Sequence, residues 1–287
     1  MDAFLAVDWG TTNRRVFRIE DGVVVATERD DRGAAAVAAN EFPAEVAGVR
    51  ERMGDLPMLL AGMVGSTIGW REVPYVDAPA GIEALARGLG RIDAQTAIVP
   101  GVAVRDPAAP DVMRGEEVQL LGAVAAALVP ADALLCQPGT HCKWAWMEAG
   151  RIARFATAMT GELFALLRGH GLLARQLGGA VEDGAAFRDG VARGARGDLA
   201  TALFGIRAAG VLGLRDDAEA ASYASGLLIG ADAAPRVDAG TAVHILADPA
   251  LGGLYATAVE TLGGTARLVD SHAAFVAGIT RIRELSS

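Results

Sequence analysis

The sequence predicts an α/β fold made of two related lobes, each with a mixed sheet flanked by helices. Each lobe is expected to begin with a strand, a polar turn and two further strands. The first copy comprises residues 3–7, 8–13, 15–19 and 23–28, and the second comprises 133–136, 137–141, 143–147 and 151–158. The Gly-Thr pairs of the two turns are 129 positions apart, and a glycine follows each at a nearly equal offset. We therefore infer one fold present twice.

Length and composition indicate a globular protein. The chain has 287 residues, enough for two lobes, and 52% of them are hydrophobic. No apolar run reaches the roughly 18 residues needed to span a bilayer, and the N-terminal stretch has no basic segment typical of a signal peptide. We expect a cytoplasmic protein that has no membrane association.

The charge balance argues against nucleic acid as a partner. The formal net charge is −9, and no basic block occurs in the chain. Because the overall field repels anions, an anionic substrate requires a local basic pocket.

The two polar turns are suited to binding phosphate. The first contains Asp8, Gly10, Thr11 and Thr12, and the second contains the pair Gly139-Thr140. A short loop of this kind directs backbone N–H groups and hydroxyls toward one anion.

Unusual residues surround the second turn. Lys143 is the only lysine among 26 basic residues, and it follows His141. Cys136 and Cys142 flank the turn; a disulfide is one reading, but reduced thiols are expected in a cytosolic protein.

Between the first three strands and the middle of the chain, the pattern predicts a helix over 41–53 and a buried strand over 57–61. The following Gly-rich stretch, 62–71, contains Trp70 and Arg71. It suits a ligand crevice at the end of a strand. The alternative is a connecting loop in which Trp70 fills the core.

A short strand at 97–99 and a loop at 105–110 precede a helix that opens within 111–117 and continues to residue 128. Glu116 and Glu117 fall in its first turn, where acids are favoured by the helix dipole alone. The functional alternative is that one of them, with Arg114 nearby, accepts a proton from a substrate hydroxyl.

Pro130 is the expected boundary between the lobes, which gives domains 1–129 and 130–287. The second lobe should be rich in helices. After a helix N-capped by Thr160, we expect helices near 182–195, 198–212 and 217–232, a strand at 242–246, a helix at 250–262, a strand at 266–269 and a helix at 271–283. Gly226 and Gly230 allow a close approach, by another backbone or a flat ring. Asp248 lies at a strand-to-helix turn where a doubly wound sheet binds nucleotides.

No Walker-type or dinucleotide glycine fingerprint is present. The paired hairpins instead resemble the actin-like (ribonuclease H-like) ATPase superfamily, in which two lobes close over ATP. Within it, the chain resembles the 2-dehydro-3-deoxygalactonokinases over most of its length. Five stretches carry this resemblance: 6–14, 61–72, 111–117, 138–144 and 159–164.

The resemblance implies MgATP-dependent phosphorylation of the 6-hydroxyl of 2-dehydro-3-deoxy-D-galactonate, at a site in the cleft between the lobes. In this scheme Asp8 binds Mg²⁺ through water, because Mg²⁺ keeps much of its hydration shell. The ATP phosphates are expected to be bound by Gly10, Thr11, Thr12, Gly139 and Thr140. The adenosine part of ATP is expected to be bound by Gly226, Gly230 and Asp248.

The superfamily usually has an acid where Gln137 stands, which moves the expected base to Glu116 or Glu117. Arg71 and Arg114 are the candidates for binding the acceptor carboxylate, and Trp70 is expected to form one side of the acceptor site. His141 and Lys143 are expected to face the acceptor or the transferred phosphoryl group.

Two alternatives stay open. One is a kinase for another small hydroxylated acid, and the other is a nucleotide-dependent sensor of the same fold without catalytic activity. The sequence also allows a homodimer.

Overall fold

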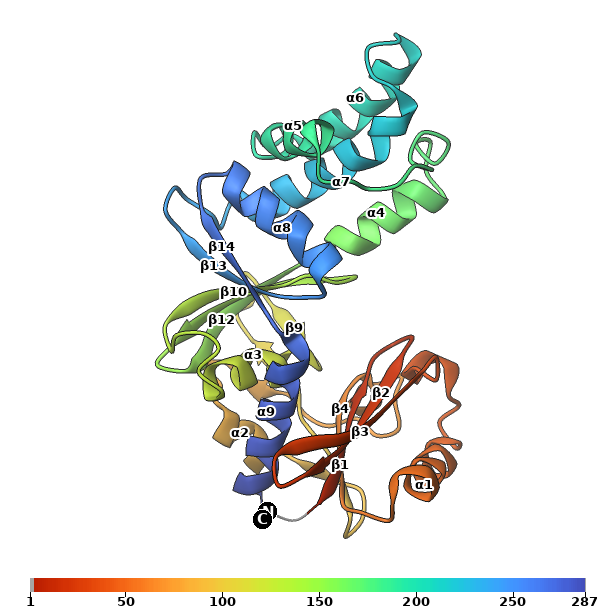
Figure 1. Cartoon of the computed structure of the whole chain (residues 1–287), viewed down its shortest axis with the longest axis vertical. Coiled ribbons are helices and arrows are strands. Elements are labelled where there is room, and N and C mark those ends of the chain that lie inside the picture. The colour runs from red at the N-terminus through yellow and green to blue at the C-terminus, as the bar shows by residue number, and fades with distance from the viewer. Residues whose placement is uncertain (1–2, 287) are drawn as a thin grey trace. The chain divides into compact units, whose positions relative to one another are not determined.

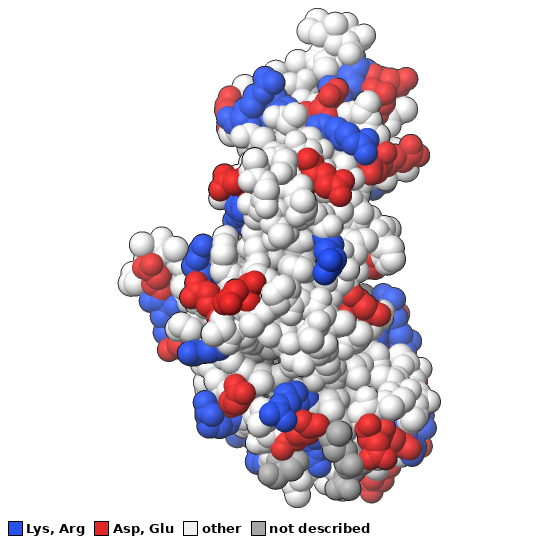
Figure 2. Space-filling model, turned by 60° about the vertical axis from the view of Figure 1, so that its left-hand side comes forward, with Lys and Arg blue, Asp and Glu red and all other residues white. Residues whose placement is uncertain are grey.

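The computed structural model describes residues 3–286. By packing, the chain divides into two compact units, whose elements are drawn in Figure 1. Within the described residues, unit 1 comprises 3–132, 145–155 and 271–286, and unit 2 comprises 133–144 and 156–270. On the face drawn in Figure 2, basic and acidic side chains are interspersed. Across the described part of the chain, no helix is both long and apolar enough to cross a membrane.

Unit 1 is built on a six-stranded sheet with the order β3-β2-β1-β4-β7-β6. Its strands are β1 (Phe4–Trp9), β2 (Arg14–Glu20), β3 (Val23–Asp30), β4 (Met58–Gly62), β6 (Gly90–Arg91) and β7 (Thr96–Ile98). The central strand β1 pairs antiparallel with β2 and parallel with β4. The carboxyl ends of β1 and β4 therefore meet at one edge of the sheet, where polar side chains can gather.

The helices of unit 1 are α1 (Phe42–Met53), α2 (Ile82–Arg87), α3 (Glu116–Ala125) and α9 (Ser271–Leu285), with short 3₁₀ turns at Ala34–Ala36 and Met63–Gly65. The predicted helix at 41–53 is confirmed, and its apolar face is buried. It packs over the sheet, where the rings of Trp9 and Phe42 lie 5.3 Å apart. This packing fixes the end of β1 that leads into the first turn.

The C-terminal helix α9 packs against α3 within unit 1. A Cβ on Gly122 would lie 2.0 Å from the Ala274 carbonyl oxygen, and one on Gly278 would lie 2.1 Å from that of Val118. Only glycine permits backbones to approach this closely. The division by packing thus differs from the expected domains 1–129 and 130–287, because residues near both 150 and the C-terminus pack with the N-terminal part of the chain.

A small sheet, β5-β8-β9, also belongs to unit 1, and the sequence did not predict it. Its strands are Val76–Asp77, Val102–Val104 and Asp111–Met113. Residue 111 therefore lies in a strand and not in the helix expected to open within 111–117. Helix α3 begins at Glu116, after Gly115 with φ 111°, and ends at Ala125. Strands of two or three residues are too short to show a periodicity.

A five-stranded sheet has the order β12-β11-β10-β13-β14. Its strands are β10 (Ala133–Gln137), β11 (Cys142–Glu148), β12 (Arg151–Ala158), β13 (Ala242–Leu246) and β14 (Thr265–Val269). The helices of unit 2 are α4 (Thr160–Gly169), α5 (Ala185–Gly194), α6 (Leu199–Val211), α7 (Asp217–Ala233) and α8 (Pro249–Thr261). The predicted sequence of strands and helices after residue 132 is confirmed.

Candidate active site

The first polar turn joins β1 to β2 and is held from outside by a glycine. The N–H of Gly10 donates to Asn13 O at 2.9 Å, which closes the turn. The carbonyls of Gly10 and Thr11 accept from residues 34 and 35, and a Cβ on Gly33 would lie 2.3 Å from the Thr12 backbone. The backbone of the turn is therefore fixed, while Thr11 and Thr12 are exposed, as binding of an anion at this turn requires.

Asp8 lies near the carboxyl end of β1, directly before this turn. Its cross-strand neighbours are Arg15 on β2 and Ala61 on β4. Burial raises the pKa of Asp8 to about 6, the Arg15 guanidinium opposes the rise, and the Glu116 carboxylate adds to it. Asp8 and Glu116 thus share one electrostatic environment, although they are 108 positions apart in the sequence.

Two glycines bring helix α3 against the ends of the strands. Gly62 ends β4 with φ 94°, and a Cβ there would lie 2.6 Å from Trp9 O. A Cβ on Gly115, the residue before α3, would lie 3.2 Å from the Gly62 Cα. Both residues have conformations that favour glycine. The N-terminus of α3 is therefore held beside the carboxyl ends of β1 and β4.

The two glutamates at this N-terminus differ in exposure. Glu116 is half-buried and accepts a hydrogen bond from Arg114 N at 3.1 Å, whereas Glu117 is fully buried and accepts one from Gly115 N at 2.7 Å. Burial, reinforced by the Glu116 charge, raises the pKa of Glu117 to about 8. A fully enclosed carboxyl cannot meet a substrate hydroxyl, so the geometry favours Glu116 as the base.

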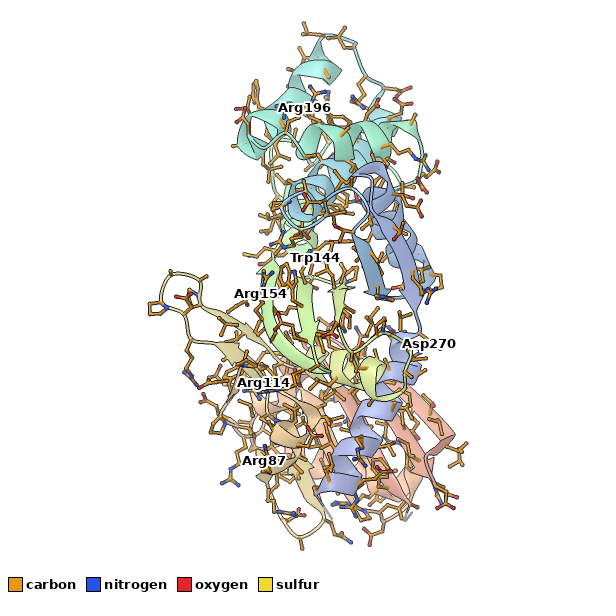
Figure 3. All side chains as sticks on the ribbon, turned by 90° about the vertical axis from the view of Figure 1, so that its left-hand side faces the viewer. Arg87, Arg114, Trp144, Arg154, Arg196 and Asp270 are labelled. Carbon is orange, nitrogen blue, oxygen red and sulfur yellow. The ribbon has the colours of Figure 1, made fainter. Side chains whose placement is uncertain are left out.

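Arg114, labelled in Figure 3, is buried with 8% of its surface exposed. Its Nη2 donates to Val73 O at 2.7 Å, and its guanidinium lies 4.2 Å from the centroid of the Tyr75 ring. Its Nε and Nη1 are enclosed and have no hydrogen-bond partner among the described residues. The side chain is thus packed inside unit 1.

The other two residues predicted on this side of the substrate site are engaged elsewhere. Trp70 stacks on Phe42 with ring centroids 6.3 Å apart and packs against the core, which agrees with the core-filling alternative. Arg71 is exposed and donates to Arg91 O at 3.0 Å. Each of these side chains therefore has a structural partner within unit 1.

The second polar turn joins β10 to β11 and is held by the start of α4. A Cβ on Gly161 would lie 2.3 Å from Gly139 O, and Glu162 N donates to Thr140 O at 2.9 Å. The arrangement parallels the first turn, because a glycine of a neighbouring element again packs on the backbone of the turn. Thr160 is the first residue of α4 and Met159 is its N-cap, so the predicted cap is one residue late.

His141 and Lys143 follow this turn in different environments. His141 is exposed, and its Nε2 lies 2.6 Å from Glu162 Oε2. Lys143 is 5% exposed, and its Nζ donates to Thr157 Oγ1 at 2.8 Å. The histidine is therefore the more accessible of the two beside the turn.

A buried carboxylate beneath the second turn was not predicted from the sequence. Asp232 on α7 accepts hydrogen bonds from Trp144 Nε1 and Thr160 Oγ1, both at 3.0 Å, and pairs with Arg236 at 3.0 Å. Burial raises its pKa, and the Arg236 charge opposes the rise. The hydroxyl of Thr160 is turned to this carboxylate, which explains why it does not cap α4. No local pattern in an Ala-rich helix marks such a residue.

The residues predicted for adenosine have structural partners. A Cβ on Gly226 would lie 2.1 Å from Phe187 O, and one on Gly230 would lie 2.3 Å from Val191 O. Both glycines thus permit the close packing of α7 on α5, which was the alternative to a nucleotide contact. Asp248 caps α8 and accepts hydrogen bonds from residues 250 and 251 at 3.1 and 3.2 Å.

The first turn and its neighbouring acids fit Mg²⁺ in part. Within residues 3–286, no group of three or more His, Cys, Asp or Glu side chains could hold a metal ion by itself. Mg²⁺ commonly binds through one or two carboxylates and completes its coordination with water and substrate phosphates. A carboxylate whose pKa is raised by burial and a second negative charge, as at Asp8, is stabilised by a nearby cation. Asp8 therefore fits a metal that binds together with nucleotide phosphates.

Comparison with known proteins identifies the family. The model of the 2-keto-3-deoxy-galactonokinase family matches residues 8–282, which include both turns and the start of α3. The chain belongs to this family. A relative from Rhizobium meliloti (strain 1021), assigned as a 2-dehydro-3-deoxygalactonokinase, is 38% identical over 96% of this chain and 95% of its own length. The 2-dehydro-3-deoxygalactonokinase of Escherichia coli (strain K12) is 34% identical, with 97% of each chain covered.

Solved structures agree with this membership. A crystal structure from Sinorhizobium meliloti, assigned to the same kinase, superposes with a TM-score of 0.91 at 34% identity over 98% of each chain. Component A of the (R)-2-hydroxyglutaryl-CoA dehydratase of Acidaminococcus fermentans has a TM-score of 0.53 at 14% identity over the full length of both chains, which shows the fold alone. The predicted α/β fold of the actin-like ATPase superfamily is confirmed.

Proposed function

We propose that this member of the 2-keto-3-deoxy-galactonokinase family transfers the γ-phosphoryl group of ATP to the 6-hydroxyl of 2-dehydro-3-deoxy-D-galactonate. The observation that carries the proposal is the arrangement in unit 1. An exposed Gly-Thr-Thr turn follows Asp8, and the half-buried Glu116 shares the electrostatic environment of Asp8. Phosphoryl transfer requires a phosphate-binding loop, a metal and a group that receives the hydroxyl proton.

Glu116 is the proposed base. It is half-buried, so a substrate hydroxyl can reach it, and its backbone is fixed by the Gly62–Gly115 contact. Glu117 in this proposal positions the turn by accepting from Gly115 N. A base that takes the proton as the oxygen attacks typically contributes about 10²–10⁴ in rate.

Asp8 is the proposed carboxylate for Mg²⁺, which neutralises charge on the phosphates when bound. The two turns bind the phosphate oxygens through Thr11, Thr12 and Thr140, which are all exposed. We place the reaction in the cytoplasm, where ATP is available as the donor.

The test is ADP formation by the purified protein with MgATP, with and without 2-dehydro-3-deoxy-D-galactonate. The proposal expects turnover that depends on the acceptor. Glu116→Gln should lower kcat by about 10²-fold or more, whereas Glu117→Gln should keep most of kcat. ATP binding without turnover on this or related keto acids would instead support a nucleotide-dependent sensor. Turnover only with a different hydroxylated acid would assign another acceptor.

A further inference from the structure

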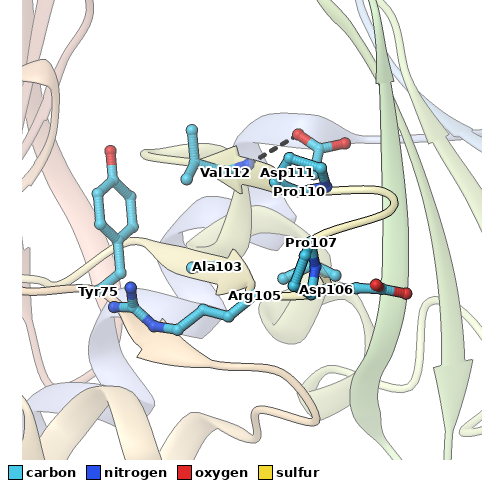
Figure 4. Close-up of a pocket in the computed structure, with 9 residues that line it drawn as sticks. Tyr75, Ala103, Arg105, Asp106, Pro107, Pro110, Asp111 and Val112 are labelled. Carbon is cyan, nitrogen blue, oxygen red and sulfur yellow. Dashed lines mark hydrogen bonds between the residues drawn. The ribbon is translucent and has the colours of Figure 1, made fainter.

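A cavity of about 630 Å³ lies in unit 1 between the small sheet and the loop 105–110. Nine residues line it: Tyr75, Ala103, Val104, Arg105, Asp106, Pro107, Pro110, Asp111 and Val112. In Figure 4, Tyr75 and the Arg105 guanidinium lie together at one side, and Pro110 and Asp111 lie at the other. Its volume is within the range of small-molecule sites.

The lining combines the groups that a hydroxylated acid needs. Tyr75 and the two prolines provide apolar surface for the carbon chain, and the carboxylates of Asp106 and Asp111 can accept hydrogen bonds from hydroxyls. Arg105 adds a guanidinium, whose planar fork binds a carboxylate through two parallel hydrogen bonds. A neutral polyol would leave this cation unused.

Arg105 can exchange its present partner, Asp77, for the carboxylate of a ligand. Its Nε donates to Asp77 at 2.6 Å, but the two side chains are 65% and 61% exposed. An exposed ion pair contributes little net free energy, so the carboxylate of a ligand can replace Asp77 at low cost. In contrast, Arg114 is buried and Arg71 is bound to Arg91 O.

The cavity is connected to the proposed base through the chain. Strand β9 supplies Asp111 to the wall and continues into α3, so the Cα atoms of Asp111 and Glu116 are at most about 18 Å apart. The Tyr75 ring that lines the cavity also holds the Arg114 guanidinium at 4.2 Å, and Arg114 N donates to the Glu116 carboxylate. A ligand in the cavity therefore contacts β9, the strand that leads into Glu116, and lies against the ring that packs on Arg114.

We propose that this cavity binds the sugar-acid acceptor, with Arg105 gripping its carboxylate and Asp111 accepting from its hydroxyls. The proposal rests on the proposed function for the identity of the acid, and it replaces Arg71 and Trp70 as the acceptor-binding residues. Arg105 is then a specificity residue for acids over uncharged analogues.

The experiment compares wild type, Arg105→Gln, Asp77→Asn and Arg87→Gln in steady-state assays. Arg87, labelled in Figure 3, is an exposed arginine of unit 1 outside the cavity lining and is the matched control. We expect Arg105→Gln to raise the acceptor KM by about tenfold or more, as loss of a charged hydrogen bond does, with the ATP KM unchanged. Arg87→Gln should leave both values unchanged.

The Asp77→Asn variant distinguishes a role of Arg105 in acceptor binding from a role in stabilising the small sheet. If Arg105 only stabilised the small sheet through Asp77, the two substitutions would raise the acceptor KM equally, and the proposal would be overturned. If Arg105 binds the acceptor, Asp77→Asn frees the guanidinium and should leave the acceptor KM unchanged or lower it. The carboxamide of the acceptor gives a further readout, because Arg105→Gln should abolish the preference for the acid over the amide.

The two proposals fail differently. Wild type that turns over the sugar acid, together with an Arg105→Gln variant of unchanged acceptor KM, overturns the cavity assignment alone. Wild type without acceptor-dependent turnover overturns the proposed function. Calorimetric titration of the same acid into wild type and Arg105→Gln then still decides the assignment, which requires binding that the substitution weakens.

Discussion

The two polar turns share one backbone design but differ in where their carboxylates lie. In each, a glycine from a neighbouring element packs on the backbone of the turn: Gly33 on Thr11 and Thr12, and Gly161 on Gly139 and Thr140. At the first turn, the partly buried Asp8 is the next-to-last residue of β1. At the second, Gln137 stands at the strand end, and the nearby carboxylate of Asp232 is buried beneath the turn.

The two carboxylates therefore suit different roles, one in the reaction and the other in the stability of the fold. A partly buried carboxylate beside a second acid, as at Asp8, can bind a metal ion next to a proton acceptor. A buried carboxylate that accepts from Trp144 and Thr160 and pairs with Arg236 holds elements together. We infer that the first turn supplies reactive groups, whereas the second only binds phosphate. Four substitutions test this comparison.

The largest effect should come from Asp8→Asn. Loss of a charge that stabilises the transition state typically lowers kcat by about 10²–10³-fold, while Gln137→Asn at the second turn should change kcat less than about threefold. Acceptor-dependent ADP formation measures both. Equal losses in the two variants would contradict the division of roles.

Asp232→Ala should have the largest effect on stability. It leaves the Arg236 charge without its buried partner, and such breaks cost about 3–5 kcal/mol. Urea denaturation measures the loss. The matched control is Asp216→Ala on the same helix, where only an exposed N-cap bond to Ala218 N is removed, at about 0.5–2 kcal/mol. If Asp232→Ala costs no more than this control, the supporting role is wrong.

Gly161→Ala should disturb the second turn alone. The new Cβ would lie 2.3 Å from Gly139 O, and overpacking of this kind costs about 1–3 kcal/mol. We expect a higher ATP KM at unchanged acceptor KM. Gly169→Ala on the same helix has open space around it and should leave both values unchanged. An unaltered ATP KM in Gly161→Ala would argue against phosphate binding at this turn.

The last prediction concerns Glu117 and the pH dependence of stability. Its pKa is raised by burial from the ordinary value of 4.5 to about 8 in the folded protein, so between these values the folded state keeps a proton that the unfolded state has lost. The free energy of unfolding therefore falls as pH rises through this window and levels off above about pH 8. Glu117→Gln should remove this decline. Thermal unfolding from pH 4.5 to 9 measures it, and an unchanged slope would show that Glu117 does not titrate as described.

Much of the fold was readable because its signals are local. The strand-turn-strand stretches, helix α1 and the helices after residue 180 follow hydrophobic periodicity. The small sheet was not readable, because its strands have two or three residues. The start of α3 was placed too early because Asp111 and Val112 pair with β8, a contact that no helical periodicity reveals.

Some residues of the candidate site could likewise be predicted from the sequence, and others could not. The residues of the two turns and the glutamates of α3 could be named from short motifs. Trp70, Gly226 and Gly230 carried ambiguous signals, since the same residue types serve packing, and the structure shows them packed. Arg14, which pairs with Asp30 and Glu45 beside the first turn, was missed because its partners are distant in sequence.

The sequence by itself determined the repeated strand-turn-strand units, their Gly-Thr turns and the fold class, because these depend on local backbone preferences and short motifs. Only the tertiary structure decided that Glu116 is accessible while Glu117 is enclosed, that Asp232 lies beneath the second turn and that Arg105 lines a cavity. The physical reason is that burial and pairing arise from long-range packing, through close contacts such as Gly62 with Gly115, and adjacent residues of one type can meet opposite environments.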